Sequence, residues 1–194
     1  VNMRAELKRL QRELGATTIF ATPDQLEALT ISDRIAIMNQ GKILQDGPPN
    51  IIYDHPNNIF TATFVGSPSM NILDCSIEEK NGRLVLNSGD FSLDVSELEE
   101  FIRKGTSQSE AVLGVRPEHI ALTQDKAAPR SVPAEVYVTE RTRPEQIVHV
   151  RVRKTMMQAV TPLTFQCDAG QKVWMTIDPA RIHLFDKRSQ NAIV

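Results

Sequence analysis

The feature that most constrains the fold is a change in the spacing of apolar residues at Gly66–Pro68. Before it, apolar residues recur at helical spacing. After it, short runs of β-branched and apolar residues alternate with turn residues. Glycine and proline are the strongest local markers of a break between elements. The sequence therefore predicts two regions, residues 1–66 and 71–194, joined by a linker at 66–70.

The first region has the pattern of an α/β fold. Met3–Leu14 predicts an amphipathic helix, and Thr17–Ala21 predicts a buried parallel strand. A second helix is expected to open with Thr22 as N-cap, Pro23 at the first helical position and Gln25 closing a capping box. Beyond it we expect a hairpin of strands 34–38 and 42–45 around Asn39-Gln40-Gly41, then helices after Gly47-Pro48-Pro49 and over 58–65.

The second region predicts mostly β structure, interrupted by one helix over 96–103 that Ser96 would cap. Many short strands at this spacing are typical of a small barrel or sandwich. No internal repeat is evident in the letters, and the pair to compare is 71–122 with 132–185. The expected strands are 72–78, 83–86, 91–95, 111–115, 120–122, 134–139, 146–152, 172–177 and 181–184.

Composition excludes several classes of protein. A formal net charge of -2 and an aromatic content of 5% give neither a basic face nor stacking platforms for nucleic acid. Apolar runs are too short to span a bilayer, and the N-terminal stretch lacks the pattern of a secretion signal. Cys75 and Cys167 lie far apart without ligand spacing, which favours reduced thiols in the cytoplasm over a disulfide framework or a metal site.

No phosphate-binding loop is present. The pattern G-x-x-x-x-G-K-[ST] does not occur, and none of the nine glycines has that spacing. Without the loop, backbone N–H groups and a lysine cannot cradle phosphates. We therefore expect no ATP hydrolysis by this chain alone, no catalytic residue and no cofactor of its own.

Three stretches together nevertheless resemble one family, and the resemblance covers almost the whole chain. They are the run Thr17–Asn71, the heptapeptide Gly114-Val115-Arg116-Pro117-Glu118-His119-Ile120, and the segment Ile177–Asp186. They are similar to the C-terminal part of ATP-binding subunits of ABC importers of the maltose and glycerol-phosphate type. The resemblance implies an α+β chain: the C-terminal remnant of a P-loop (RecA-like) ATPase domain over 1–66, then a TOBE/OB-like, MOP-like regulatory β-barrel over 71–194.

Within this resemblance, Pro23 stands where the family has its H-loop histidine, which reaches the terminal phosphate of ATP. Proline has no side-chain donor, so a degenerate ATP site is one hypothesis. The other is that Pro23 is a helix opener, and the two are compatible. Asp24, Gln25 and Glu27 follow the family pattern, but without a phosphate loop they are better explained by helix electrostatics and solvated charge.

The heptapeptide supplies the candidate regulatory or interface residues Arg116, Glu118 and His119. Pro117 forces a corner after a strand, and the three polar groups at that corner could bridge the barrel and a neighbouring domain. A strand break with surface charges is the plainer alternative. His119 has no second histidine or cysteine at ligand spacing, so no metal site is predicted.

The resemblance implies a parent protein that uses ATP and Mg²⁺, lies at the inner face of the plasma membrane and pairs with permease subunits. This part would serve dimerisation, as a homodimer or with a paired homologue, and regulation of an importer for sugars or related polyols. Val1 in place of methionine favours a fragment of something longer. Two alternatives stay open: an oxyanion-binding (molybdate-like) barrel, with Gly114 and Ser131 as slight support, and the tail of a polyamine or metal importer ATPase.

Overall fold

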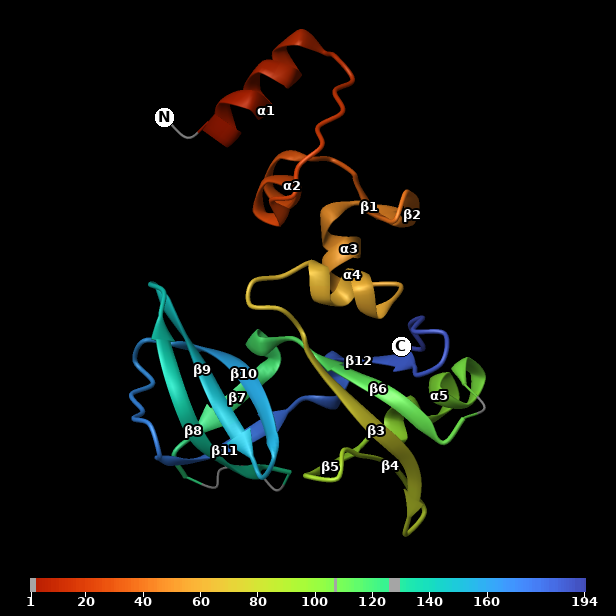
Figure 1. The fold of residues 1–194 in the computed structure, drawn as a ribbon, viewed down its shortest axis with the longest axis vertical. Helices are drawn as coiled ribbons and strands as arrows, with labels where there is room; N and C mark the ends of the chain where they lie inside the picture. Colours follow the sequence, from red (N-terminus) through yellow and green to blue (C-terminus); the bar gives the residue numbers. More distant parts are fainter. Residues whose placement is uncertain (1–2, 107, 126–129) are drawn as a thin grey trace. The chain divides into compact units, whose positions relative to one another are not determined.

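A computed structural model describes residues 3–106, 108–125 and 130–194. The chain forms two compact units that divide between Ser67 and Pro68 (Figure 1). Over the described residues, no helix combines the length and apolar character needed to cross a bilayer. Unit 1 precedes the division and unit 2 follows it.

Unit 1 contains four helices and one β-hairpin over its described residues. Its small core joins the hairpin to the two helices that follow, through Ile35, Ile37, Ile52 and Val65. The elements are α1 (Met3–Leu14), α2 (Gln25–Ile31), β1 (Ile35–Asn39), β2 (Lys42–Gly47), α3 (Pro49–Asp54) and α4 (Ile59–Phe64).

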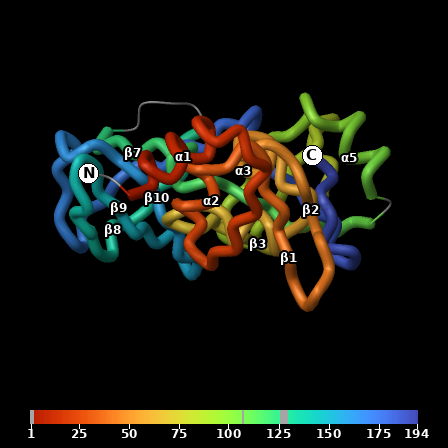
Figure 2. The backbone as a smooth tube through the Cα atoms, turned by 90° about the horizontal axis from the view of Figure 1, so that it is seen from above, coloured from red at the N-terminus to blue at the C-terminus, as the bar shows by residue number. Residues whose placement is uncertain are grey.

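The hairpin prediction is confirmed. Strands β1 and β2 pair antiparallel, and the turn residues Gln40 and Gly41 both have positive φ, 48° and 76°. Two successive residues with positive φ match the twist of the flanking strands, and glycine takes this conformation without steric cost. Figure 2 shows the hairpin as a narrow projecting loop with this turn at its tip.

Two expectations for unit 1 are wrong. Thr17–Ala21 is not a strand: Ile19 is 96% exposed, and no described strand lies beside this segment to complete its hydrogen bonds. The next helix also starts later than expected. Asp24, not Thr22, is its N-cap, because the Asp24 carboxylate accepts from the backbone N–H groups of two first-turn residues. The Gln25 side chain bonds the backbone of Gly66 instead of closing a capping box.

Unit 2 is built from ten strands over its described residues, with one α-helix and three short 3-10 turns. The first group comprises β3 (Asn71–Lys80), β4 (Arg83–Asn87), β5 (Ser92–Asp94), η1 (Ser96–Leu98), α5 (Glu99–Gly105), β6 (Glu110–Val115), η2 (Pro117–His119) and β7 (Ile120–Thr123). The second comprises β8 (Val132–Arg141), β9 (Glu145–Val152), β10 (Thr155–Pro162), β11 (Lys172–Ile177), η3 (Pro179–Arg181) and β12 (Ile182–Asp186).

The strands form two five-stranded antiparallel sheets, with the orders β12-β6-β3-β4-β5 and β7-β11-β8-β9-β10. The orders are equivalent when each strand of the first group is matched with the corresponding strand of the second. Each group contributes its final strand to the other sheet, so β7 and β12 are exchanged (Figure 1). The halves compared in the sequence are therefore structurally related repeats, and η2 and η3 are the equivalent corners before the exchanged strands.

One hydrophobic core serves both sheets. Buried side chains from the first, such as Leu113 and Leu184, belong to the same cluster as Val150 and Met175 from the second. Strand β7 also lies against β10, so the second sheet curls until its two end strands approach each other. This is the geometry of a small β-barrel.

The strand predictions for unit 2 are confirmed with shifted ends, but β10 was missed. It follows β9 through Arg153 and Lys154, and Arg153 takes the positive φ of 53° that glycine or asparagine would have signalled. Ser96 does not cap a helix as expected. Its hydroxyl donates to Asp94 and accepts from the backbone of Leu84, which ties the turn to β4.

Candidate functional site: a corner and a junction between the sheets

The corner predicted to regulate or form an interface is the η2 turn between β6 and β7. Its side chains have different environments: Arg116 is 1% exposed, Glu118 is exposed and His119 is half-buried. The His119 Nδ1 atom is buried, and within the described part of the chain it makes no hydrogen bond. Pro117–His119 packs against β10, so this corner contacts the second sheet.

These environments divide the three candidates. The Arg116 guanidinium is buried, so only groups packed around it can contact it. A buried charge needs such polar partners. Glu118 is the member of the set that solvent or a partner can reach directly. A role for Arg116, Glu118 and His119 in regulation or at an interface stays a prediction.

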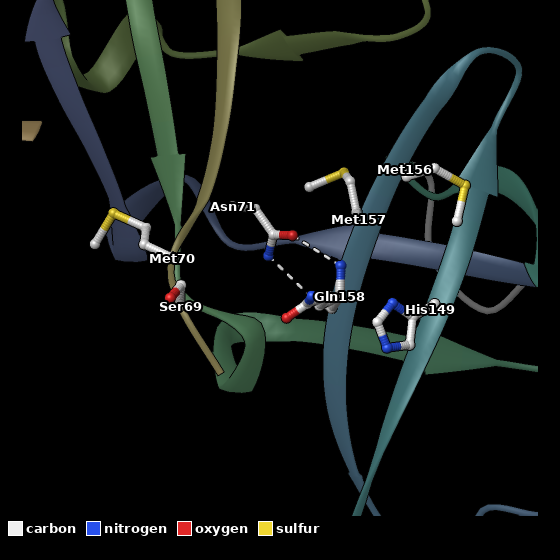
Figure 3. Close-up of a pocket in the computed structure, with 7 residues that line it drawn as sticks. All are labelled: Ser69, Met70, Asn71, His149, Met156, Met157 and Gln158. Carbon is white, nitrogen blue, oxygen red and sulfur yellow. Dashed lines mark hydrogen bonds between the residues drawn. The ribbon is translucent and has the colours of Figure 1, made fainter. Parts of the chain in front are cut away.

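A second site, which sequence reasoning missed, lies where the linker enters unit 2. A hollow of about 170 Å³ is lined by Ser69, Met70 and Asn71 from the chain entering β3, and by residues of β9 and β10 (Figure 3). The Asn71 amide nitrogen donates to the carbonyl of Gln158 at 2.9 Å and of Val115 at 3.1 Å. Its amide oxygen accepts from the Gln158 N–H at 2.7 Å. Asn71 thus joins β3 and β6 of one sheet to β10 of the other.

A second polar side chain joins the sheets at the β9–β10 turn. The Asp90 carboxylate accepts from the backbone N–H of Lys154 at 3.1 Å and from the Thr155 hydroxyl at 2.7 Å. The Thr155 hydrogen bond is the main reason that the pKa of Asp90 lies below its usual range. The signal for both junctions was an isolated Asn or Asp beside a turn, which is too common in sequences to indicate a contact about 65 to 87 residues away.

Gly114, one of the residues that supported an oxyanion site, is occupied by packing. A Cβ atom at Gly114 would lie 2.5 Å from the Met70 sulfur and 2.9 Å from the ring of Phe185. The glycine therefore allows Met70 to sit against β6, and its backbone is not open to a ligand. Ser131 lies just before β8 and is half-buried.

The structure also bears on metal ligation, on the two cysteines and on Pro23. Among the described residues, no group of three or more His, Cys, Asp or Glu side chains could hold a metal ion. Cys75 and Cys167 are free thiols. Burial raises the pKa of the Cys75 thiol to about 11, and burial also raises the pKa of Cys167.

Pro23 lies before the first residue of α2, so it is outside the helix that it was expected to open.

Comparison with known proteins agrees with this architecture. A family model described as the MalK OB fold domain matches residues 66–120, and one described as the TOBE domain matches residues 113–185. The first spans most of the strands before the η2 corner, and the second begins in β6 and ends in β12. Fold and family models together define an OB-fold and TOBE-domain protein of mixed α+β content, mostly strand.

Curated relatives match along the whole chain. It is 39% identical to the trehalose/maltose import ATP-binding protein MalK of Thermococcus litoralis, over all of this chain and 53% of that protein. It is 35% identical to the multiple sugar-binding transport ATP-binding protein MsmK of Streptococcus mutans, over all of this chain and 54% of the relative. Along its whole length the chain is similar to MalK/MsmK-type ABC transporter ATP-binding subunits, as its resemblance implied.

The chain spans about half the length of the curated relatives it matches. Among solved structures, the molybdate-binding protein ModG superposes with a TM-score of 0.46 at 11% identity, over 59% of this chain and 94% of that one. Similarity at this level is too low to indicate a shared ligand.

Proposed function

We propose that the chain is the C-terminal, regulatory part of the ATP-binding subunit of an ABC importer for sugars or related polyols. The observation that carries the proposal is the match to MalK and MsmK along the whole of this chain, together with the OB-fold and TOBE unit. Unit 1 is then the end of the ATPase domain. The parent protein would use ATP and Mg²⁺, work with permease subunits at the cytoplasmic face of the membrane, and this part would pair two subunits.

The outer faces of the two sheets support pairing through the second one. On the outer face of the first sheet, the Glu78 carboxylate accepts hydrogen bonds from the side chains of Ser76 and Asn87, so these three polar groups satisfy one another. On the second, Tyr137 is 59%, Val138 42% and Met156 46% exposed.

Tyr137 and Val138 lie at the bulge of β8, and Val138 pairs with His149, which in turn lies opposite Gln158 of β10. Side chains directly opposite each other in an antiparallel pair share a face of the sheet. Exposed apolar side chains gathered on one face are typical of an interaction surface.

Sedimentation equilibrium over a wide concentration range tests the pairing. We expect a dimer, and we expect Tyr137→Ser to weaken it at least tenfold, the effect of about 1.4 kcal/mol. Phe101→Ser is the matched control, because Phe101 of α5 is similarly exposed, at 57%, but lies on the other half of unit 2. A monomer at all concentrations would overturn the pairing, and equal effects of the two variants would place it elsewhere.

A phosphate-release assay tests the other half of the proposal. With Mg²⁺ and ATP, the chain should release no phosphate above the buffer blank, because it lacks the loop that binds phosphates. Turnover that follows the protein through purification and scales with its concentration would contradict the assignment.

A further inference from the structure

Strand β10 presents a long free edge. It is the last strand of its sheet, eight residues from Thr155 to Pro162, and among the described strands only β9 forms a hydrogen-bonded ladder with it, while the η2 corner and β7 pack against it. Unpaired N–H and C=O groups along such an edge form a template for pairing with another strand. Two short polar side chains meet this edge, Asp90 at its beginning and Asn71 at its middle.

Asn71 makes the contacts that a neighbouring strand would make. In an antiparallel ladder, a hydrogen-bonded residue both donates its N–H and accepts at its C=O on the same side. The backbone of Gln158 makes both contacts with the Asn71 side chain. Its N–H donates to the Asn71 amide oxygen, and its carbonyl accepts from the Asn71 amide nitrogen (Figure 3). The same nitrogen also donates to Val115 of β6, which fixes the orientation of the amide.

The backbone of Asn71 belongs to the first sheet. Asn71 is the first residue of β3 and pairs with Val115 of β6. The preceding Met70 is 4% exposed and has its sulfur against Gly114. The linker therefore ends in two consecutive anchors, Met70 on the first sheet and the Asn71 amide on the second.

We propose that Asn71 is a latch that closes the free edge of β10 and couples it to the end of the linker. The inference concerns unit 2 alone and goes beyond the proposed function. The latch depends on an amide, because the Gln158 N–H needs an acceptor while two carbonyls need a donor. Asn71 is thus a positioning residue, and it holds β10 in place of a missing strand.

Amide hydrogen exchange of the full chain, followed residue by residue by NMR, tests the latch. In Asn71→Ala, the Gln158 amide should exchange roughly tenfold faster or more, which corresponds to about 1.4 kcal/mol of lost protection. The amides of Lys154 and of the β3 interior should keep their wild-type rates. Asp90→Ala should show the reverse pattern, with faster exchange at Lys154 and an unchanged rate at Gln158.

Two further variants separate a latch from ordinary local contacts. Asn71→Asp keeps an acceptor for Gln158 but places a carboxylate against two carbonyl oxygens, so the Gln158 amide should again exchange faster. Ser69→Ala, in the same hollow, is the matched control and should leave both edge amides unchanged. Protection of Gln158 retained in Asn71→Ala or Asn71→Asp, or an equal acceleration throughout both sheets, would overturn the proposal.

Discussion

The two halves of unit 2 arrange equivalent strands in the same order, yet they differ at their ends. The end strand β5 has three residues and is followed by η1 and α5, whereas its counterpart β10 has eight residues and is followed by a loop. Gln146 holds this loop by donating to the carbonyls of Pro162 and Phe165. A short end strand followed by a helix has little free edge, while a long one needs contacts such as those of Asn71 and Asp90.

The corners of the two halves also differ, in the polar residue that precedes the turn. Arg116 and Asp178 both precede a proline that starts a 3-10 turn, but the arginine is buried and the aspartate carboxylate accepts from the backbone N–H of Ala180 at 2.9 Å. Equivalent places in a repeated fold thus carry a buried cation in one half and a local cap in the other. The two halves share the same backbone path, but their polar side chains make different contacts.

The largest expected effect tests whether the halves are one folding unit. Leu113 and Met175 lie at equivalent places on β6 and β11, and both are 0% exposed. Replacing either with alanine should lower the free energy of unfolding by about 2–5 kcal/mol. Because the core is shared, Leu113→Ala should shift the urea midpoint reported by the fluorescence of Trp174, which lies on the other sheet. An unshifted Trp174 transition would show that the halves unfold independently.

The next comparison is between the two corners. Arg116→Ala should destabilise the protein by about 3 kcal/mol, because it disrupts the polar contacts of a buried charge. Asp178→Ala should cost about 1 kcal/mol, the usual effect of losing a cap. Urea unfolding of both variants against wild type measures the difference. Equal losses would contradict the contrast between the corners.

A pH titration sharpens the contrast between the outer faces. Hydrogen bonds from Ser76 and then Asn87 lower the pKa of Glu78 to about 2. Since the unfolded pKa is about 4.3, the contribution of Glu78 to stability is present above that pH and is lost as pH falls towards 2. In Asn87→Ala, the carboxyl pKa measured by NMR should rise. A pKa already near 4.3 in the wild type would show that this polar network is not formed in solution.

The smallest effect makes one half resemble the other. Cys75 of β3 pairs with Ala111 of β6, and its counterpart Ala134 of β8 pairs with Val173 of β11; both Cys75 and Ala134 are buried. Cys75→Ala should lower the free energy of unfolding by less than about 1.5 kcal/mol, because the change removes only one buried side-chain atom. In the wild type, Cys167 should react with a thiol reagent before Cys75, whose burial raises its pKa to about 11. Faster reaction of Cys75 would contradict its burial.

Much of the fold was predictable where the signal is local. The hairpin at Gln40-Gly41 and the capped helix α4 follow from turn and capping residues that act within a few positions. The expected strand at Thr17–Ala21 failed because a strand exists only beside a partner, and β10 was missed because Arg153 is an unusual turn residue. Of the candidate site, the η2 corner was identified from Pro117, but the burial of Arg116 was not.

By itself, the sequence determined the resemblance to one family, the alternation of short strands after residue 70 and the absence of a phosphate-binding loop, because each depends on residue types at fixed spacing. Only the tertiary structure decided that β7 and β12 exchange sheets and that Asn71 reaches Gln158. Strand exchange depends on how the core closes, and a hydrogen bond across 87 residues depends on a fold that no local pattern encodes.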